Sequence, residues 1–531
     1  MVQLPATPCQ VRTILYHLVV ANEPEEGANS HKMNITTEQG DLLESSADTI
    51  IVNLFEGVTA PGGATGAVDH ALGGAISDLI AGGDFSGKLG DTAVLYPRGA
   101  IAAQRVLVAG LGEREGFDLE SVRRASAHAI LRARELKANH VATIVHGAGI
   151  GGLAVDAAAQ ATLEGTLLAL YSYHAPGLSA TDPHMIDALT IVEYERDKMD
   201  AIEAGAAAAQ AVSAGVYMAR EMVNMPPNIA TPSRLASMAE DLSDEFASID
   251  VFVGGRKWAH DQNLGAFLAV AKGAGEKPKF VVVEYNGDGP ALETIVLVGK
   301  GITFDTGGIS LKPVAGMGKM KADMGGAAAM LGAMKAIAQL ELPLHVVAIT
   351  PFTENMPDAG AYRPADVITA SNGKTIEIIS TDAEGRMTLA DALVYAQRYE
   401  PSAVVDMATL TGSNVVALGE GIAASLFCND SDLRDRLIAA AEATHERIWP
   451  MPLWDEYRAK IKSGVADMKN SGGRTGGVGT SAVFLKEFTD YSWAHLDIAG
   501  LELQETAEKP YTQPGATGFG VRLVVELLRN W

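Results

Sequence analysis

The chain of 531 residues contains two cysteines, Cys9 and Cys428, which show no paired spacing. A disulfide framework is therefore excluded, and thiolate metal sites are not expected. Apolar runs are also short, because no window approaches the run of about 18 residues that crosses a bilayer. The most alanine-rich stretch, residues 201–222, is interrupted by charged and amide side chains, so we expect a core helix there. These absences favour a reducing, cytoplasmic location with no membrane span.

Basic residues are also scarce relative to acidic residues. The 41 Lys and Arg residues face 65 Asp and Glu residues, which gives a net charge of −24. Nucleic-acid binding requires clustered basic residues, so this balance disfavours it as a general role. The best basic cluster is Arg123 and Arg124 with Arg132 and Arg134. A hydrophobic fraction of 47% and a charged fraction of 20% are typical of a globular protein with a buried core.

The first part of the chain alternates predicted strands and helices. Apolar runs at residues 49–55, 105–109 and 141–145 predict strands, and helical periodicity at 68–80 and 120–136 predicts helices. This alternation is typical of an α/β domain.

A glycine-rich turn at residues 110–112 raises the hypothesis of nucleotide binding, but it lacks the third glycine of the dinucleotide fingerprint. A long helix predicted at 197–224 marks the domain boundary. We predict an N-terminal extension at 1–32, an α/β domain at 33–198 and a larger domain at 199–531. A start-site extension and a disordered tail both remain open for residues 1–32.

The second part repeats strands and helices with longer connections. Strands are predicted at residues 251–253, 280–285, 292–298, 345–349, 375–379, 404–406 and 495–497. Helices are predicted at residues 327–340, 389–398, 432–443 and 521–528, and a further helix after Thr231, its expected N-cap, with Pro232 at the first position. The predicted fold class is α/β with two domains, a smaller N-terminal α/β domain and a larger C-terminal domain whose mixed central sheet is flanked by helices.

Acidic residues gather where the predicted strand 375–379 meets the helix that follows it. Alternate side chains of an extended backbone share a face, so Asp382, Glu384 and Arg386 are expected to point into one cavity. Two carboxylates on one wall repel each other unless a proton or a cation lies between them. This arrangement indicates a site for a positively charged group.

Two further acids, Asp305 and Asp323, follow an upstream glycine-rich loop that also carries Lys300 and Lys312. Four converging carboxylates are enough to bridge two hard divalent ions. The alternatives are solvated loop carboxylates, a surface lysine at position 300, and a phosphate cradle. The cradle is the weakest of these, because the loop lacks the Gly-Lys-Ser/Thr order.

Five motifs in this order resemble the leucyl aminopeptidase family of dizinc peptidases, the cytosol aminopeptidases. They are KGITFDTGG at 300–308, MKADMGG at 320–326, TDAEGR at 381–386, DMATLTG at 406–412 and WAHLDIAG at 493–500. The resemblance covers the chain from about Gly205 to the C-terminus, and the N-terminal region only loosely. Ser380 stands where the family usually has asparagine, a position that is not a metal ligand.

The resemblance implies a metal-dependent aminopeptidase that releases N-terminal residues from peptides, with leucine and other apolar residues preferred. It also implies two divalent metal ions per chain. Asp305 and Glu384 would touch both ions, Asp382 one of them, and Lys300 and Asp323 the other. Zn²⁺ or Mn²⁺ is expected, with Mg²⁺ or Co²⁺ as the alternatives.

For catalysis, the resemblance implies that Lys312 stabilises the oxyanion and that Arg386 holds a bicarbonate ion that shuttles the proton. The carbonyl of Leu410 would orient Lys312. The predicted substrate-binding residues are Met320, Thr409, Leu410 and Gly412. His495 lies in an apolar strand, so we expect it to be structural.

The resemblance further implies peptide substrates and a homo-hexamer. A DNA-binding accessory protein on the same fold is the alternative function, although the shortage of basic residues weighs against it. An inactive homologue is disfavoured because all seven ligand and catalytic positions carry the expected residues. A dimetal phosphoesterase would normally use histidine ligands, which these motifs lack.

Overall fold

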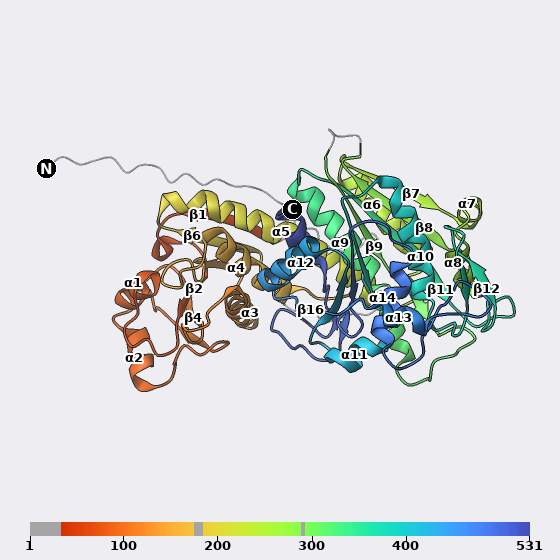
Figure 1. Ribbon diagram of the computed structural model, residues 1–531. Helices are drawn as coiled ribbons and strands as arrows, with labels where there is room; N and C mark the ends of the chain where they lie inside the picture. Colours follow the sequence, from red (N-terminus) through yellow and green to blue (C-terminus); the bar gives the residue numbers. More distant parts are fainter. Residues whose placement is uncertain (1–32, 175–183, 288–291) are drawn as a thin grey trace. The chain divides into compact units, whose positions relative to one another are not determined.

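The computed structural model describes residues 33–174, 184–287 and 292–531 (Figure 1). The predicted extension at 1–32 lies outside the described residues. The chain forms two compact units. One ends at Ala214 and also contains Ala507–Gln513, and the other contains Gly215–Thr506 and Pro514–Trp531. The predicted limits at 33–198 and 199–531 stay a prediction, because the point of division falls within the long helix α5 (Met199–Asn224).

The N-terminal unit contains a six-stranded sheet with the order β1-β6-β5-β2-β4-β3. Its strands are β1 (Asn34–Gln39), β2 (Thr49–Leu54), β3 (Thr92–Leu95), β4 (Arg105–Gly110), β5 (His140–Thr143) and β6 (Ala188–Glu193). All neighbouring pairs are parallel except β3 and β4. The central strands are apolar on both faces, as parallel strands between helices require.

The helices of this unit are α1 (Gly63–Ala71), α2 (Ala75–Gly82), α3 (Leu119–Glu135) and α4 (Val155–Leu170). The single helix predicted at 68–80 is wrong. Gly73 and Gly74 have φ angles of +67° and +91°, a left-handed conformation that ends α1 and starts α2. The helix predicted at 120–136 is confirmed as α3, which Asp118 caps by accepting the Ser121 N–H.

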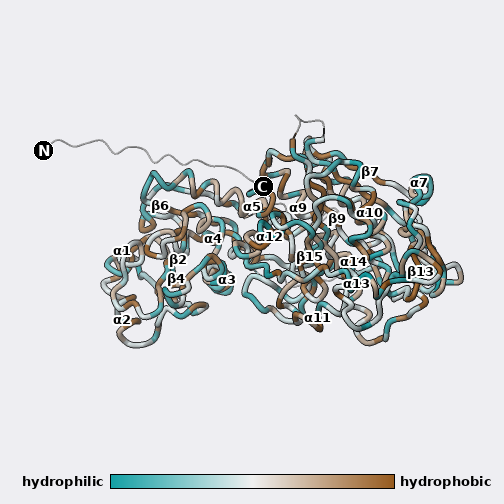
Figure 2. Tube along the Cα trace, in the orientation of Figure 1, coloured by the Kyte–Doolittle hydropathy of each residue, from teal (hydrophilic) through white to brown (hydrophobic). Residues whose placement is uncertain are grey.

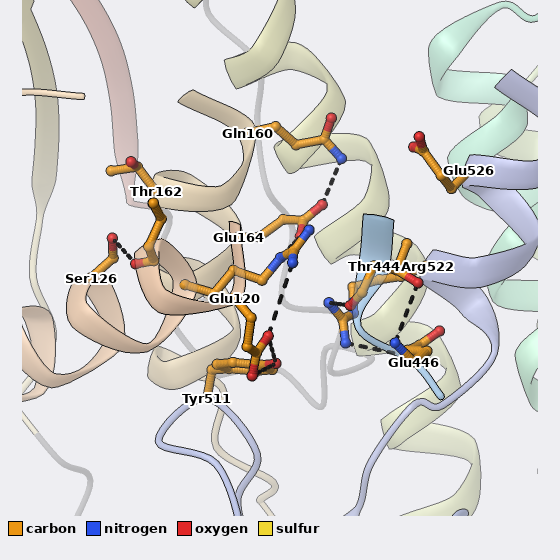
Figure 3. A network of polar contacts seen from close by, with 12 residues as sticks. Glu120, Ser126, Gln160, Thr162, Glu164, Thr444, Glu446, Tyr511, Arg522 and Glu526 are labelled. Atoms are coloured by element: carbon orange, nitrogen blue, oxygen red, sulfur yellow. Dashed lines mark hydrogen bonds and ion pairs between the residues drawn. The ribbon is translucent and has the colours of Figure 1, made fainter. Parts of the chain in front are cut away.

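Helices α3 and α4 share a buried polar cluster (Figure 3). Arg123 Nε lies 2.8 Å from Glu164 Oε2, and Gln160 donates to the other oxygen of Glu164 at 2.7 Å. The hydroxyl of Tyr511 donates to Glu120 at 2.7 Å from Oε2 and 2.9 Å from Oε1. Tyr511 belongs to the late segment Ala507–Gln513, so this unit uses residues from near the end of the chain.

The second unit is built on a nine-stranded mixed sheet with the order β16-β15-β18-β14-β9-β11-β8-β7, to which β10 adds by pairing with β11. Its strands are β7 (Ile249–Gly254), β8 (Lys279–Tyr285), β9 (Thr294–Gly299), β10 (Gly301–Asp305), β11 (His345–Asn355), β14 (Ala403–Ala408), β15 (Ala424–Cys428), β16 (Ile448–Pro450) and β18 (Trp493–Asp497). The parallel neighbours β11, β9, β14 and β18 form its centre. The predicted mixed sheet is thereby confirmed.

The remaining strands of this unit form two small sheets. They contain β12 (Val367–Thr369), β13 (Thr375–Glu377) and β17 (Met468–Lys469), and β19 (Leu503–Gln504) with β20 (Gly515–Ala516). The strand predicted at 375–379 is therefore shorter than expected and pairs outside the large sheet.

The helices of this unit are α6 (Pro232–Glu245), α7 (Arg256–Asp261), α8 (Gly265–Val270), α9 (Gly325–Leu340), α10 (Gly385–Ala396), α11 (Gly412–Leu418), α12 (Ser431–Thr444), α13 (Asp455–Lys460), α14 (Gly477–Lys486) and α15 (Val521–Arg529). Thr231 caps α6 with Pro232 at its start, as predicted. Helix α15 packs against both α9 and α12, while α10 packs against α8 and α14. Short α7 is largely hydrophilic (Figure 2). Among the described segments, each helix is too short or too polar to span a bilayer.

Glu446 fixes the start of α15. Its Oε2 accepts the N–H groups of Gly520 and Leu523 at 3.1 and 2.9 Å, and its other oxygen lies 3.5 Å from Arg522 (Figure 3). A carboxylate at a helix N-terminus satisfies amides that have no partner within the helix. The last helix is thereby anchored within the second unit.

Candidate metal centre

The acidic motifs lie on turns at the ends of strands, two of them next to strands of the large sheet and one after β13 of a small sheet. Lys300 lies between β9 and β10, Asp305 ends β10, and Asp323 follows the short 3-10 helix Met317–Ala322. Asp382 and Glu384 lie in the turn between β13 and α10. Strand ends are where α/β proteins commonly place their sites.

Glycines allow these turns to pack closely. A Cβ on Gly326 would lie 2.0 Å from the Met407 carbonyl oxygen, so only glycine lets the start of α9 reach β14. A Cβ on Gly385 would lie 2.3 Å from the Cε atom of Lys300. The glycines of the motifs therefore make room for a lysine inside the cluster.

Three carboxylates meet directly. One oxygen from each of Asp305, Asp382 and Glu384 lies within 4.8 Å of the other two. The expected convergence is found, but the expected extended backbone is wrong. Asp382 lies in a turn, and Glu384 has helical angles of −76° and −38° as the N-cap residue of α10. The turn, and not strand alternation, brings the two acids together.

Two lysines lie between the carboxylates. Lys300 Nζ lies 2.7 Å from Asp323 Oδ1, 3.0 Å from Glu384 Oε1 and 2.8 Å from the Thr409 carbonyl oxygen. Lys312 Nζ lies 2.7 Å from Asp305 Oδ2 and 2.5 Å from Asp382 Oδ1. Each ammonium group thus bridges two carboxylates.

The charges perturb one another strongly. Burial alone would lower the pKa of Lys300, but the carboxylates of Asp323, Glu384 and Asp305 outweigh it and raise this pKa above its usual range. Burial and the neighbouring Glu384 raise the pKa of Asp305 to about 6. Burial likewise raises the pKa of Asp382. The two lysine ammonium groups do not balance the charge of the four carboxylates, so the cluster lacks positive charge.

The donor atoms fit divalent cations. Asp323 Oδ2 and Glu384 Oε2 are buried and have no hydrogen-bond partner among the described residues. A buried carboxylate oxygen without a partner is costly unless a cation binds it. Oxygen-rich, carboxylate-dominated sites suit hard divalent ions, and two such orphan oxygens beside shared carboxylates suit a bridged pair.

Residues that the sequence did not single out hold the carboxylates in place. The Asn355 amide donates to Asp305 Oδ1 at 2.7 Å and to the Thr381 carbonyl oxygen at 3.0 Å. The Tyr362 hydroxyl donates to the same carbonyl at 2.9 Å. Asn355 ends β11, beyond residue 349 where the sequence predicted this strand to end, so no local signal pointed to it.

Asn470 organises the other side of the acidic turn. Its Oδ1 accepts the Ile379 N–H at 2.8 Å, and its Nδ2 donates to the Ser380 carbonyl at 2.7 Å. Its main-chain oxygen accepts Arg386 Nη1 at 3.0 Å. Burial lowers the pKa of Arg386, and the guanidinium forms no ion pair with Asp382 or Glu384 in the part of the chain that is described.

The predicted substrate-binding residues lie around Asp323 and the loop after β14. Thr409 donates its hydroxyl to Asp323 Oδ1 at 2.8 Å, and the Met320 carbonyl accepts the Asp323 N–H. The Leu410 N–H donates to Asp497 at 3.1 Å, and Gly412 starts α11. The carbonyl that contacts a lysine is that of Thr409, with Lys300 as donor, whereas Lys312 pairs with carboxylates.

His495 lies apart from this cluster. Its Nδ1 is 2.6 Å from Asp406 Oδ1, and its ring stacks with those of Phe427 and Trp493. The side chain is buried in β18. The prediction of a structural histidine is confirmed.

Comparisons with known proteins identify both halves of the chain. Residues 217–525 match the model of the cytosol aminopeptidase family, catalytic domain, and residues 51–175 match its N-terminal domain. A probable cytosol aminopeptidase of Roseiflexus castenholzii is 44% identical over 502 residues, covering 94% of this chain and 99% of the relative. One from an Azoarcus species is 44% identical over 496 residues, covering 90% and 95%.

Solved structures agree with this assignment. A tomato leucine aminopeptidase mutant superposes with a TM-score of 0.83 at 33% identity, covering 95% of this chain and 98% of that one. The bottromycin maturation enzyme BotP in complex with Mn gives a TM-score of 0.79 at 34% identity, covering 91% and 99%. The chain therefore belongs to the cytosol aminopeptidase family and is a metal-dependent aminopeptidase, a hydrolase.

Proposed function

We propose that this enzyme removes the first residue from peptides with a free α-amine, preferring leucine and other apolar residues, and that it uses two divalent ions per chain. The observation that carries the proposal is the cluster of four carboxylates and two lysines, in which two buried carboxylate oxygens have no partner among the described residues. An internal peptide nitrogen is an amide and a poor metal ligand. A free amine is a good one, so such a centre selects chain ends.

The proposed metal ligands are Lys300, Asp305, Asp323, Asp382 and Glu384. Asp305 and Glu384 would be shared, Asp382 would complete one position, and Lys300 with Asp323 the other. When bound, a pair of divalent ions would polarise the scissile carbonyl and lower the pKa of a water toward about 7. Zn²⁺ or Mn²⁺ is proposed first, and Mg²⁺ or Co²⁺ second. The Mn complex of BotP, which has the same fold, supports this choice.

Lysine 300 must lose its proton to act as a ligand. The carboxylates around it favour the ammonium form in the metal-free chain, so each metal-binding event at this position releases a proton. Dications nearby reverse that preference, because a neighbouring positive charge favours the neutral amine. We therefore propose that Lys300 releases a proton when metal ions bind.

We assign Lys312 to the negative charge that develops on the carbonyl oxygen. Its ammonium group is partly exposed and is held by Asp305 and Asp382, which places it at the edge of the cluster. A fixed cation at this point stabilises an oxyanion without reorganising. Asp305 and Asp382 would turn toward the metal ions when these bind, which frees the ammonium group for substrate.

Arg386 is the proposed holder of a bicarbonate ion, which would supply a base for proton transfer. The buried Nε of its guanidinium has no acceptor among the described residues, and Nη1 is satisfied by a neutral carbonyl. A guanidinium binds a planar anion in a bidentate manner. Asn470 keeps this side chain facing the acidic turn.

Met320, Thr409, Leu410 and Gly412 are proposed to form the wall around the first residue of the peptide. Met320 and Thr409 both contact Asp323, and a methionine gives such a wall an adaptable apolar surface. Gly412 has open space at its Cβ position, which leaves room for a side chain of the substrate.

Assembly into a homo-hexamer and a cytoplasmic location also belong to the proposal. The net charge of −24 is the reason to expect no nucleic-acid partner. The DNA-binding alternative finds no support in the family matches, which both describe aminopeptidase domains.

The test is hydrolysis of a panel of aminoacyl anilides by metal-stripped enzyme to which Zn²⁺, Mn²⁺, Mg²⁺ or Co²⁺ is added back. We expect no activity without metal, recovery at two ions per chain, and the fastest turnover with leucine or methionine. An N-acetylated leucine anilide is the control for the free amine. Turnover of that substrate at the full rate would falsify the proposal.

A further inference from the structure

The N-terminal unit contains a cavity of about 740 Å³ that the aminopeptidase reaction does not use. It lies outside the carboxyl ends of β1, β6, β5, β2 and β4, because residues that directly follow each of these strands line it. Its volume falls in the range of roughly 300–1,000 Å³ that is typical of sites for small organic ligands. All of its lining residues belong to this unit.

The cavity is centred on the point where the sheet changes direction. After β2 the chain passes through α1, α2 and the edge strand β3 to β4 on one side, and after β5 it passes through α4 to β6 on the other side. The connections that leave β2 and β5 therefore diverge, although these two strands are neighbours. In open α/β sheets this divergence opens a crevice in which ligands bind.

One end of the cavity presents donors suited to an anion. Arg114 follows β4, and its guanidinium has no carboxylate partner in the described chain. It donates to the Ile150 carbonyl at 2.8 Å and lies 5.9 Å from the centre of the Phe55 ring. The amide groups of residues 148–151 make no hydrogen bond to any described residue. Free amides beside a guanidinium are the donor set that a phosphate group requires.

The loop that carries these amides is tightly built. Gly147 has a φ angle of +88°, and a Cβ there would lie 2.8 Å from the Phe117 ring. A Cβ on Gly151 would lie 2.5 Å from the Gly147 carbonyl oxygen. Only glycine therefore fits at both positions of this loop. Gly149 differs, because its Cβ position opens onto free space.

The rest of the cavity suits a ring with hydroxyl or amino groups. Asn53, near the end of β2, donates its Nδ2 to His146 Nδ1 at 2.8 Å. The side-chain oxygen of Asn53 is left to accept a hydrogen bond from a ligand. Ile150 and Tyr194 line the cavity with 63% and 76% of their surface exposed. Large apolar side chains exposed at a cavity gain stability when a flat ring covers them.

Two acidic lining residues, Asp41 and Glu193, lie at the opposite end from Arg114, whereas Glu56 lines the cavity just after β2. Asp41 follows β1 and Glu193 ends β6, at the far edge of the sheet from β4. Lys198 neutralises the neighbouring Glu195 at 2.9 Å. Carboxylates at this end accept hydroxyl donors, as they do from a ribose in dinucleotide sites. The two ends together match a molecule that is anionic at one end and rich in hydroxyl groups at the other.

We propose that this cavity binds a phosphorylated nucleoside, with its phosphates on the loop 147–151 and Arg114 and its nucleoside between Asn53, Tyr194 and Glu193. This inference does not depend on the reaction proposed for the carboxylate cluster.

Calorimetric titration of the full chain with ADP, GDP, CDP and UDP tests the proposal, with adenosine and pyrophosphate as partial ligands. We expect at least one diphosphate to bind once per chain, about 10-fold or more tightly than either partial ligand. Because nucleotides also bind metal ions, the titration is repeated after chelation, and the dissociation constant should stay within about twofold. Loss of binding on chelation would assign the ligand to the metal centre and overturn the proposal.

Three variants localise the binding. Arg114→Ala should weaken it about 10- to 100-fold, because it removes a charge-assisted hydrogen bond. Gly149→Leu should abolish it, since the new side chain enters the cavity from a backbone that is not left-handed and meets no atom within 4 Å at its Cβ. Lys88→Ala, which removes an exposed charge away from the cavity, is the matched control and should bind as the wild type does.

All three variants should keep the far-ultraviolet circular dichroism and the aminopeptidase activity of the wild type, which excludes loss of binding through misfolding. Binding that survives both Arg114→Ala and Gly149→Leu overturns the proposal. So does the absence of binding by all four diphosphates at millimolar concentration. Equal affinity for pyrophosphate and the diphosphates would also overturn it, because the cavity would then recognise only an anion.

Discussion

Arg386 donates its Nη1 to the main-chain oxygen of Asn470 at 3.0 Å, while the buried Nε of the same guanidinium has no acceptor in the described chain. A guanidinium that only balanced Asp382 and Glu384 would be expected to pair with them. In the structure Nη1 instead donates to a neutral carbonyl, and Nε could donate to an anion such as the proposed bicarbonate. Kinetic measurements can distinguish whether Arg386 balances the charge of the two acids or holds a bicarbonate ion.

The Arg386→Ala variant should keep both metal ions and bind substrate about normally, yet turn over slowly. Added bicarbonate should raise the kcat of the wild type in degassed, carbonate-depleted buffer and hardly affect the variant, because the anion has lost its binding group. The measurement is kcat against bicarbonate concentration for both proteins. Equal responses would remove bicarbonate from the mechanism.

The Lys312→Ala variant should lower kcat by about 10²- to 10³-fold, the loss typical of one oxyanion contact. Both metal ions should remain, because Lys312 is assigned to the substrate and not to a metal. Elemental analysis of the purified variant gives the metal content. Lys300→Ala is the matched comparison and should retain fewer than two ions. If Lys312→Ala were the variant that lost an ion, the two lysine roles would be exchanged.

Asn355→Ala should weaken metal binding by about 10- to 100-fold, because it removes the hydrogen bond that orients Asp305. Competition with a chelator of known affinity measures the change. Asn429→Ala is the control, since its amide bonds the Tyr491 carbonyl and touches no proposed ligand. Unchanged metal affinity in Asn355→Ala would show that the Asn355 amide is not needed to position Asp305.

His146 should make the N-terminal unit sensitive to mild acid. Burial lowers the pKa of His146 from 6.5 to about 4. Between these values the unfolded chain binds a proton that the folded chain excludes, so stability is complete above pH 6.5 and falls as the pH decreases. At pH 5.5 the loss amounts to about 1.4 kcal/mol.

His146→Gln keeps a polar side chain that does not titrate in this range, so the variant should lack that loss. The measurement is hydrogen exchange of the slowest amides in β2 and β5, in wild type and variant, at pH 7 and 5.5. The difference in opening free energy between the two proteins should change by about 1.4 kcal/mol between the two pH values. A constant difference would mean that His146 has the same pKa in the folded and the unfolded chain.

The acids could be found from the sequence because their signals are local. Asp305 and Asp382 each follow a run of strand-like residues, and the glycines after them permit the tight turns in which they lie. Asn355 and Asn470 carry no such signal. They act across 50 and 84 residues on Asp305 and Arg386, and one asparagine among many has no pattern that reveals a distant partner.

The elements of the fold also differ in whether their signals are local or depend on distant residues. Continuous apolar runs predicted the parallel central strands, because such strands are buried on both faces. Short or peripheral elements such as β12, β17 and α11 were not predicted, since they depend on tertiary contacts. The helix expected at 68–80 failed for a local reason: Gly73 and Gly74 are adjacent, and the glycine pair was itself a breaker signal.

The hydrogen bond between Tyr511 and Glu120 joins residues 391 positions apart within the N-terminal unit. A ribosome that adds about 5–20 residues per second needs about 20–80 s to travel that distance. Throughout that interval the nascent unit holds the buried carboxylate of Glu120 without its hydroxyl partner. The N-terminal unit can therefore gain this hydrogen bond only when synthesis of the chain is nearly finished.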